Sequence, residues 1–292
     1  MHDDSDSRGF AADFALMQAM DRRAAMRLLA GAALTPLWPA LGCDDATTAA
    51  ADVAANPDTA PDTGIPGDAA ADAAPEVDAT PGPDAAATCD PIPPETGGPY
   101  PGDGSNGPNI LAMDGVTRRD IRTSIGTASG TAAGVPMTMR LTIVDAATCA
   151  PLVGRAVYVW QCDRDAEYSM YTLTTENYLR GVQVTDSSGA VEFLSIFPAC
   201  YAGRWPHVHF EVYANLAAAT ASAPDLGTSQ LALPKAACDA VYATAGYEQS
   251  VINLSKITLA TDGVFKDGSA LQLATTTGDV AAGYVAALTV GV

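Results

Sequence analysis

Two of the three histidines in this chain stand two positions apart, in His207-Val-His209. Side chains at alternate positions of a β-strand face the same side, so the two imidazoles would converge on one point. Imidazole is a common ligand of transition metals, and such a pair could give two nitrogen ligands to one ion. The pair alone does not establish a site, because two packing or surface histidines would leave the same pattern.

Nearby tyrosines strengthen the case for a metal. Tyr201 stands six residues before His207, and Tyr168 lies in a Glu-Tyr-Ser sequence. Phenolate is a hard anionic donor that suits Fe(III), whereas zinc usually draws Cys, His, Asp or Glu. The chain has ten tyrosines, and most tyrosines are packing residues, so Tyr171 and Tyr178 are alternatives to Tyr168. These residues therefore predict a metal site built from imidazoles and phenolates.

Alternating polarity predicts the strands that would carry this site. The turn-forming residues 186–189 predict a hairpin between the strands on either side, and one short helix is expected near Lys235 to Ala245. Many short strands at this spacing predict an all-β fold, an antiparallel β-sandwich core with one short helix. The expected strands are 137–144, 155–161, 181–185, 190–194, 207–213 and 229–233.

As an ordered set, the motifs around these residues resemble the intradiol ring-cleaving dioxygenases, especially their secreted, catechol dioxygenase-like branch. The similarity covers roughly residues 92 to 250, more than half of the chain. The matching segments are 149–163, 167–169, 179–189, 196–198, 201–204 and 207–210.

The resemblance implies a set of roles for individual residues. Arg204 would stabilise negative charge that develops on the substrate ring, and Gln230 would help to position substrate and oxygen. Tyr201 would leave the metal as a catechol chelates it, and O2 would cleave the ring to a muconate-type dicarboxylic acid. The implied cofactor is one non-haem Fe(III), held by Tyr168, Tyr201, His207 and His209.

The sequence departs from the family beside Tyr201, where Cys200 stands in place of the usual tryptophan. As a chain neighbour of Tyr201, this thiol is expected to point away from the metal. Trp205 could line the substrate mouth or pack in the core. The rival function is a non-catalytic, metal-binding or structural β-sandwich lipoprotein, but retention of the whole ligand set with Arg204 favours an enzyme. The particular catechol and the oligomeric state stay open.

The first 43 residues have the layout of an export signal. Paired arginines, Arg22 and Arg23, precede a short apolar run, as in twin-arginine signals. The run is interrupted by prolines and is too short to span a bilayer, which needs about 20 apolar residues. Residues 40–43, Ala-Leu-Gly-Cys, resemble a lipobox, so we expect export to the periplasm or cell surface with a lipid on Cys43. The alternative is an ordinary cleavage site with an incidental cysteine.

The acidity of the chain is concentrated in one segment. The net charge is -19, yet residues 44–90 alone hold eleven acidic residues and no basic one. Residues 44–88 are almost wholly Ala, Asp, Pro, Thr and Gly, a composition typical of a disordered linker. Residues 89–292 are then expected to form the dioxygenase-like domain. This charge balance argues against nucleic acid as a partner.

Six cysteines stand at positions 43, 89, 149, 162, 200 and 238. If Cys43 carries a lipid, five remain in an oxidising compartment. No pair has the C-x-x-C spacing and none matches a zinc template, which favours disulfide bridges. The pairing cannot be deduced from the spacing, so the connectivity stays open.

Overall fold

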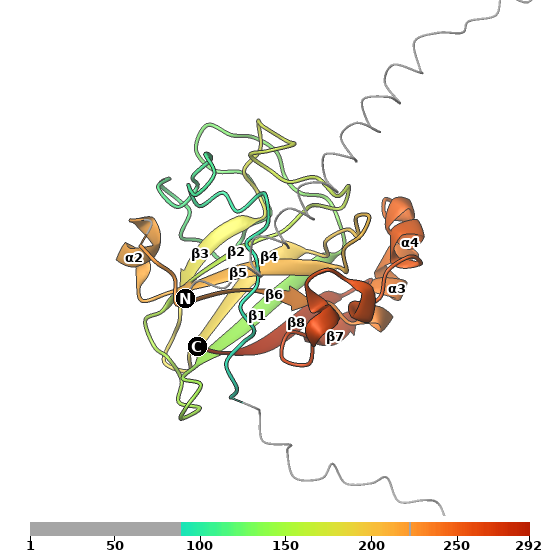
Figure 1. The fold of residues 1–292 in the computed structure, drawn as a ribbon. Coiled ribbons are helices and arrows are strands. Elements are labelled where there is room, and N and C mark those ends of the chain that lie inside the picture. Colours follow the sequence, from blue (N-terminus) through green and yellow to red (C-terminus); the bar gives the residue numbers. More distant parts are fainter. Residues whose placement is uncertain (1–88, 222) are drawn as a thin grey trace, which may run out of the picture. The chain divides into compact units, whose positions relative to one another are not determined.

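The computed structural model of this chain describes residues 89–221 and 223–292. The expected export signal (1–43), its lipidated Cys43 and the expected linker (44–88) lie outside these residues. The described part contains two four-stranded sheets, ordered β4-β1-β8-β7 and β3-β2-β5-β6, joined by long loops (Figure 1). Their strands are β1 (Pro136–Val144), β2 (Ala156–Trp160), β3 (Arg180–Val184), β4 (Ala190–Ile196), β5 (His207–Tyr213), β6 (Gly227–Ala232), β7 (Thr275–Asp279) and β8 (Gly283–Gly291).

Two sheets with few helices confirm the all-β class, but the expectation of a single helix is wrong. Helix α3 (Lys235–Tyr242) is the predicted one. Helices α2 (Leu216–Thr220) and α4 (Glu248–Leu254) and two 3-10 turns, η1 (Leu259–Thr261) and η2 (Phe265–Asp267), were not predicted. Each is too short to display a helical period in the sequence. Figure 1 shows α2 on one side of the sheets and α3 and α4 on the opposite side.

The sequence predicted purely antiparallel sheets, and this prediction is wrong for one pair of strands. β1 pairs antiparallel with β4 on one side but parallel with β8 on the other, from Met137 opposite Tyr284 to Val144 opposite Gly291. A parallel pair has no short connecting turn that the sequence could reveal, and these are the first and the last strand of the fold.

The hairpin predicted across residues 186–189 is also wrong, although its turn forms. The Asp186 carboxylate accepts the N–H groups of Ser188 at 2.8 Å and Ala190 at 3.0 Å. Gly189 has a φ of 76°, and a Cβ there would stand 2.4 Å from the Ile143 carbonyl oxygen. The flanking strands, however, pair with different partners, β3 with β2 and β4 with β1. The turn therefore carries the chain from one sheet to the other.

The central strands β2 and β5 are buried along their whole length. On β5, Val208, Phe210 and Val212 belong to a large apolar core that also contains β1 side chains such as Leu141. The alternate residues of β5 face the other way, where a second cluster of loop and strand residues includes Tyr213. Because both faces of β5 are covered, the polar side chains on its second face lie inside the protein.

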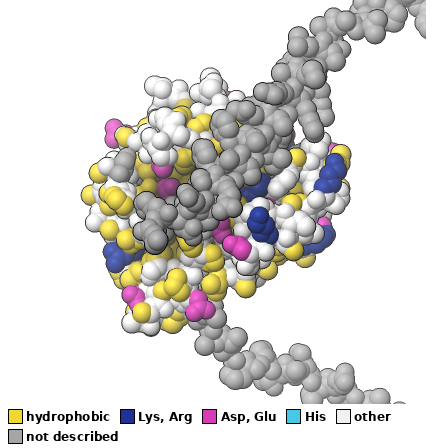
Figure 2. All heavy atoms as spheres, viewed as in Figure 1, with side chains coloured by type: hydrophobic (Ala, Val, Ile, Leu, Met, Phe, Trp, Pro, Cys, Tyr) yellow, Lys and Arg dark blue, Asp and Glu magenta, His cyan; other side chains and the backbone are white. Residues whose placement is uncertain are grey.

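The surface carries few basic groups on the face drawn in Figure 2. Its Lys and Arg side chains stand apart from one another, and no histidine is visible there. Within residues 89–221 and 223–292, no helix combines the length and apolarity needed to cross a membrane.

One disulfide bridge joins Cys89 to Cys149, whose Cα atoms are 5.3 Å apart. The other three cysteines of the described part, Cys162, Cys200 and Cys238, are buried free thiols. The prediction of disulfide bridges is thus confirmed for Cys89 and Cys149 and not for the other three cysteines of the described part. Cys200 lies in the large core and its thiol contacts the backbone of Arg204, as a structural thiol would.

Replacing both bridged cysteines, Cys89→Ser with Cys149→Ser, should lower the free energy of unfolding. The bridge closes a loop with a sequence separation of 60 residues, and cross-linking a loop of this size contributes about 4 kcal/mol in the chain-entropy model. Urea unfolding of native and double-mutant protein measures the difference. A reductant should destabilise native protein and leave the double mutant unchanged, and equal sensitivity of both proteins would contradict the assigned bridge.

Candidate functional site

Strand β5 brings the two histidines together as the sequence predicts. The Nε2 atoms of His207 and His209 are 3.1 Å apart, and both side chains are buried. The neighbouring strands cover His209 from both sides, because Trp160 on β2 and Gln230 on β6 are its register partners. The indole of Trp160 stacks on the His209 ring with centroids 4.9 Å apart and planes 6° apart.

The two predicted tyrosines come from loops on the same side of the sheet. The hydroxyl of Tyr201, in the loop before β5, lies 3.1 Å from Nε2 of His207. Tyr168, in the loop between β2 and β3, lies edge-on to Tyr201, with ring centroids 6.3 Å apart. Its hydroxyl oxygen is buried and makes no hydrogen bond. All four side chains predicted as ligands therefore gather in one place.

The alternative tyrosines have other partners. The Tyr171 hydroxyl donates a hydrogen bond to Asn106 at 2.6 Å and accepts one from the Gly102 N–H. The Tyr178 hydroxyl donates to the Asp163 carboxylate at 2.9 Å. Both hydroxyls are used in holding loops, which leaves Tyr168 as the tyrosine with an uncommitted oxygen.

This donor set fits a metal ion. Nδ1 of His207 lies 2.5 Å from the Trp205 carbonyl oxygen, which can only accept, so Nδ1 carries the proton and Nε2 presents its lone pair to the site. With metal–ligand bonds of about 2.1 Å, neighbouring ligands at right angles stand about 3 Å apart, close to the observed spacing of the two Nε2 atoms. Among residues 89–221 and 223–292, no three His, Cys, Asp or Glu side chains gather to form a metal site. The donors that the structure does bring together are two imidazole nitrogens and the hydroxyls of two tyrosines.

Burial sets the charge state of these groups in the absence of a cation. Desolvation lowers the pKa of His207 well below its ordinary value, and the positive charge of Arg204 lowers it further. Desolvation likewise raises the pKa of Tyr168 well above its ordinary value. Neutral imidazoles and a neutral phenol result, and only a cation among them would favour the phenolate.

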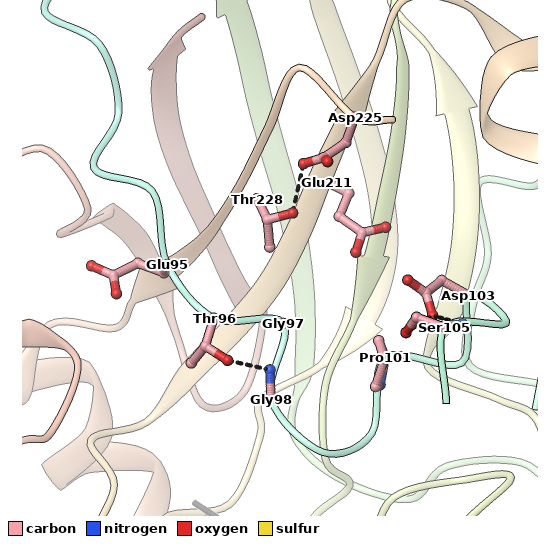
Figure 3. Close-up of a pocket in the computed structure, with 10 residues that line it drawn as sticks. All are labelled: Glu95, Thr96, Gly97, Gly98, Pro101, Asp103, Ser105, Glu211, Asp225 and Thr228. Atoms are coloured by element: carbon pink, nitrogen blue, oxygen red, sulfur yellow. Dashed lines mark hydrogen bonds between the residues drawn. The ribbon is translucent and has the colours of Figure 1, made fainter. Parts of the chain in front are cut away.

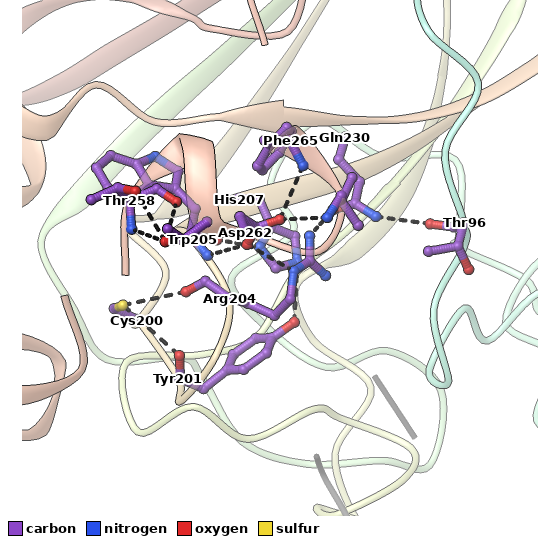
Figure 4. A network of polar contacts seen from close by, with 12 residues as sticks. Thr96, Cys200, Tyr201, Arg204, Trp205, His207, Gln230, Thr258, Asp262 and Phe265 are labelled. Atoms are coloured by element: carbon purple, nitrogen blue, oxygen red, sulfur yellow. Dashed lines mark hydrogen bonds and ion pairs between the residues drawn. The ribbon is translucent and has the colours of Figure 1, made fainter. Parts of the chain in front are cut away.

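Arg204 and Gln230, the other two residues predicted for the site, are bonded to each other. Nη2 of Arg204 donates to the Gln230 side-chain oxygen at 2.5 Å, and Nε2 of Gln230 donates to the Thr96 carbonyl at 2.9 Å (Figure 4). Arg204 also forms a buried ion pair, with its Nε 3.0 Å from the carboxylate of Asp262. The guanidinium is thus held from two sides.

Sequence reasoning missed Asp262 and assigned no role to Trp160. Asp262 stands 58 residues after Arg204 in a Thr-Asp-Gly sequence that reads as an ordinary turn, so only the folded chain brings the two together. Trp160 lies in segment 149–163, one of the motifs that resemble the family, and this was the signal in the sequence that could have pointed to a role in the site. Trp205 packs rather than lining a mouth: it is buried, and its indole N–H donates to the Leu233 carbonyl at 2.8 Å.

A hollow of about 540 Å³ is lined in part by Thr96, whose carbonyl oxygen bonds to Gln230 (Figure 3). None of the predicted site residues lines it, and four carboxyl groups do: Glu95, Asp103, Glu211 and Asp225. Desolvation raises the pKa of Glu95 to about 7 and that of Glu211 to about 8. The Glu95 carboxyl also accepts a hydrogen bond from Gln272 at 3.0 Å.

Comparison with known proteins locates the similarity on this site. A family model described as Dioxygenase matches residues 107–220, which include every predicted site residue except Gln230. This match confirms the resemblance to the dioxygenase family. No curated protein matches the chain.

Several solved structures are similar to the chain at low identity. An intradiol ring-cleavage dioxygenase from Tetranychus urticae is 23% identical over 60% of this chain and 86% of its own, with a TM-score of 0.49. The dioxygenase domain of a dioxygenase and carbohydrate-binding protein fusion from Streptomyces sp. SirexAA-E is 21% identical over 70% and 98%, with a TM-score of 0.44. A catechol 1,2-dioxygenase from Pseudomonas arvilla C-1 is 21% identical over 63% and 59%, with a TM-score of 0.41.

Glu95 should make stability fall as pH rises. Its pKa is raised from 4.5 to about 7 in the folded protein, so its stabilising contribution is complete below pH 4.5 and is lost as the pH rises through about 7. The free energy of unfolding of native protein, minus that of Glu95→Gln, should fall by about 1 to 2 kcal/mol across this range, with solvent screening allowed for. Urea unfolding at several pH values measures it.

Glu248 offers a control of opposite sign. The Gly246 N–H donates to its carboxylate and lowers the pKa, so its contribution is lost as the pH falls. The difference between native and Glu248→Gln should therefore rise with pH. A flat difference for Glu95→Gln, or one that rises, would contradict the raised pKa of Glu95.

Proposed function

We propose that this chain is a non-haem Fe(III) intradiol dioxygenase that cleaves a catechol-type ring with O2 to a muconate-type dicarboxylic acid. The observation that carries the proposal is the convergence of two imidazole Nε2 atoms and the Tyr201 hydroxyl within about one ligand spacing. The match of residues 107–220 to the dioxygenase family model supports the same function.

The chain supplies two neutral and two anionic ligands, a set that suits a ferric ion. His207 and His209 would bind through Nε2, and Tyr168 and Tyr201 through their phenolate oxygens. When bound, Fe(III) would act as a Lewis acid on the chelated catechol and as a template for its reaction with O2. Once Tyr201 has left the metal, the Tyr168 phenolate and the doubly deprotonated catechol would balance the ferric charge inside a buried site.

Proton transfer falls to Tyr201 in this proposal. A catechol must lose both hydroxyl protons to chelate a metal. A phenolate at Tyr201 would accept one of them, and solvent hydroxide the other. Tyr168 would keep its place, since its ring packs against Tyr100 with centroids 5.1 Å apart and against Tyr201. The two tyrosines would thus have different roles although they supply the same chemical group.

Arg204 would stabilise the negative charge that develops on the ring. Its guanidinium is buried, so its field is little screened by water, and its bonds to Gln230 and Asp262 fix it in advance. Gln230 is itself oriented by the Thr96 carbonyl, which takes its amide N–H. Substrate would then meet donors that do not need to reorganise.

We also propose that the enzyme is exported to the periplasm or cell surface and attached to a membrane through a lipid on Cys43. The arginine pair and the Ala-Leu-Gly-Cys sequence support export, and the Cys89–Cys149 bridge is typical of an oxidising compartment. We infer a β-sandwich from the two sheets, whose facing side chains share one apolar core.

Oxygen uptake with a panel of catechols tests the proposed activity. Iron-loaded native protein should consume O2 with at least one catechol and form a ring-opened dicarboxylic acid, identified by mass spectrometry. His207→Ala removes one nitrogen ligand and should abolish uptake. Tyr171→Phe is the matched control: it removes a tyrosine hydroxyl that is bonded to Asn106 instead of facing the histidines, and it should retain activity. Iron-loaded native protein that consumes no O2 with any catechol would contradict the enzyme and favour a binding module.

A further inference from the structure

Asp262 is a fully buried carboxylate between the turns η1 and η2, and both of its oxygens are used. Oδ1 accepts the backbone N–H groups of Val264 at 2.8 Å and Phe265 at 3.1 Å. Oδ2 accepts the backbone N–H of Trp205 at 2.6 Å and Nε of Arg204 at 3.0 Å (Figure 4). One carboxylate thus bonds to two separate parts of the chain.

The hydrogen bonds accepted by the two carboxylate oxygens have different structural roles. The Oδ1 contacts are those of a turn in which an aspartate binds the N–H groups two and three residues ahead, and they need no site to account for them. The Oδ2 contacts reach back 57 and 58 residues to the loop that precedes the histidines. Formation of the turn does not require them.

The Oδ2 contacts act on a buried cation. The exposed fractions of the Arg204 and Asp262 side chains are 2% and 0%, so neither charge is solvated by water. A buried charge is tolerated when it is paired and its remaining hydrogen bonds are satisfied. Asp262 therefore compensates the charge of Arg204 and fixes the direction of its Nε–H bond.

The same oxygen is linked to a histidine through one residue. Trp205 gives its N–H to Asp262, and its carbonyl oxygen receives the Nδ1 proton of His207 at 2.5 Å. Nη2 of Arg204, on the other side, bonds to Gln230. Asp262 is thereby joined to the groups proposed to stabilise the ring anion and to the backbone that sets the tautomer of a ligand.

We propose that Asp262 is a positioning residue for ring cleavage, which acts by holding the Arg204 guanidinium in the orientation that stabilises charge on the substrate ring. The inference rests on the proposed function. A donor fixed before the reaction contributes more to the transition state than one that must reorganise, and arginine has many rotamers to lose. Without the carboxylate, Arg204 would keep its charge but lose its fixed direction.

Asp262→Asn separates positioning from turn formation. The amide oxygen can still accept from Val264 and Phe265, while the amide NH2 that replaces Oδ2 can accept neither from Nε of Arg204 nor from the Trp205 N–H. We expect kcat with catechol to fall about tenfold or more with KM little changed, because the interaction lost is one that acts in the transition state. The visible absorption of the iron-loaded variant should match that of native protein, since no metal ligand is altered.

A double-mutant cycle with Arg204→Ala distinguishes positioning from a general effect. Arg204→Ala should lower kcat by about 100- to 1000-fold, the usual effect of removing one charge-stabilising donor. If Asp262 acts through Arg204, Asp262→Asn should cause little further loss in the Arg204→Ala background. Losses that multiply would mean that Asp262 acts elsewhere and would overturn the inference.

Asp163→Asn is the matched structural control. Asp163 is a buried aspartate that accepts backbone N–H groups of Asp165 and Glu167 and the Tyr178 hydroxyl, with no arginine in this network. It should lower the melting temperature while leaving kcat unchanged. If Asp262→Asn does not fold, Asp262→Glu, which keeps the charge and shifts the carboxylate by one methylene, takes its place in the cycle with the same expectation.

The outcomes separate this inference from the proposed function. Active native protein combined with a folded Asp262 variant of unchanged kcat, or with multiplicative losses, overturns the positioning role alone. Native protein that binds iron, absorbs visible light and consumes no O2 with any catechol overturns the proposed function and the positioning role with it. Active native protein with a non-additive cycle and an unaltered resting spectrum supports both.

Discussion

The site depends on two imidazole nitrogens that face each other at 3.1 Å inside the protein. Both are neutral because burial lowers their pKa values, so two lone pairs would repel unless a proton or a cation lies between them. Their geometry follows from β5, whose alternate positions share one face, and from its central place between β2 and β6. The side chains of Tyr201 and Tyr168 lie beside this pair, Tyr201 with its hydroxyl 3.1 Å from Nε2 of His207 and Tyr168 edge-on to Tyr201.

The fold holds these donors by burying polar groups and pairing them. Segments far apart in the chain each contribute one fixed contact: Thr96 orients Gln230, Trp160 stacks on His209, and Asp262 pairs with Arg204. The buried polar groups of Arg204, Gln230 and Asp262 satisfy one another, and a partial network would cost more than an apolar core. Thr96 also lines the acidic hollow, which none of the four proposed metal ligands lines.

Local features of the sequence predicted much of this arrangement. The His-x-His spacing identified one face of β5, and alternating polarity located β1 and β5, because these signals depend only on neighbouring residues. The parallel pairing of β1 with β8, the passage from β3 to β4 between sheets and the pairing of Arg204 with Asp262 depend on contacts between distant segments. The turn at residues 186–189 uses the same residue types whether the flanking strands pair with each other or enter different sheets. These residues therefore could not distinguish a hairpin from a crossing between sheets.

Titration of metal-free protein with Fe(III), followed by visible absorption, tests the four-residue metal site most directly. Tyrosinate ligands should produce a broad charge-transfer band that saturates at about one ion per chain, as expected for a single site of this type. Tyr168→Phe and Tyr201→Phe should each weaken or shift the band, while Tyr178→Phe, whose hydroxyl bonds to Asp163, should leave it unchanged. Protein that binds a full equivalent of Fe(III) and stays colourless would contradict the proposed site.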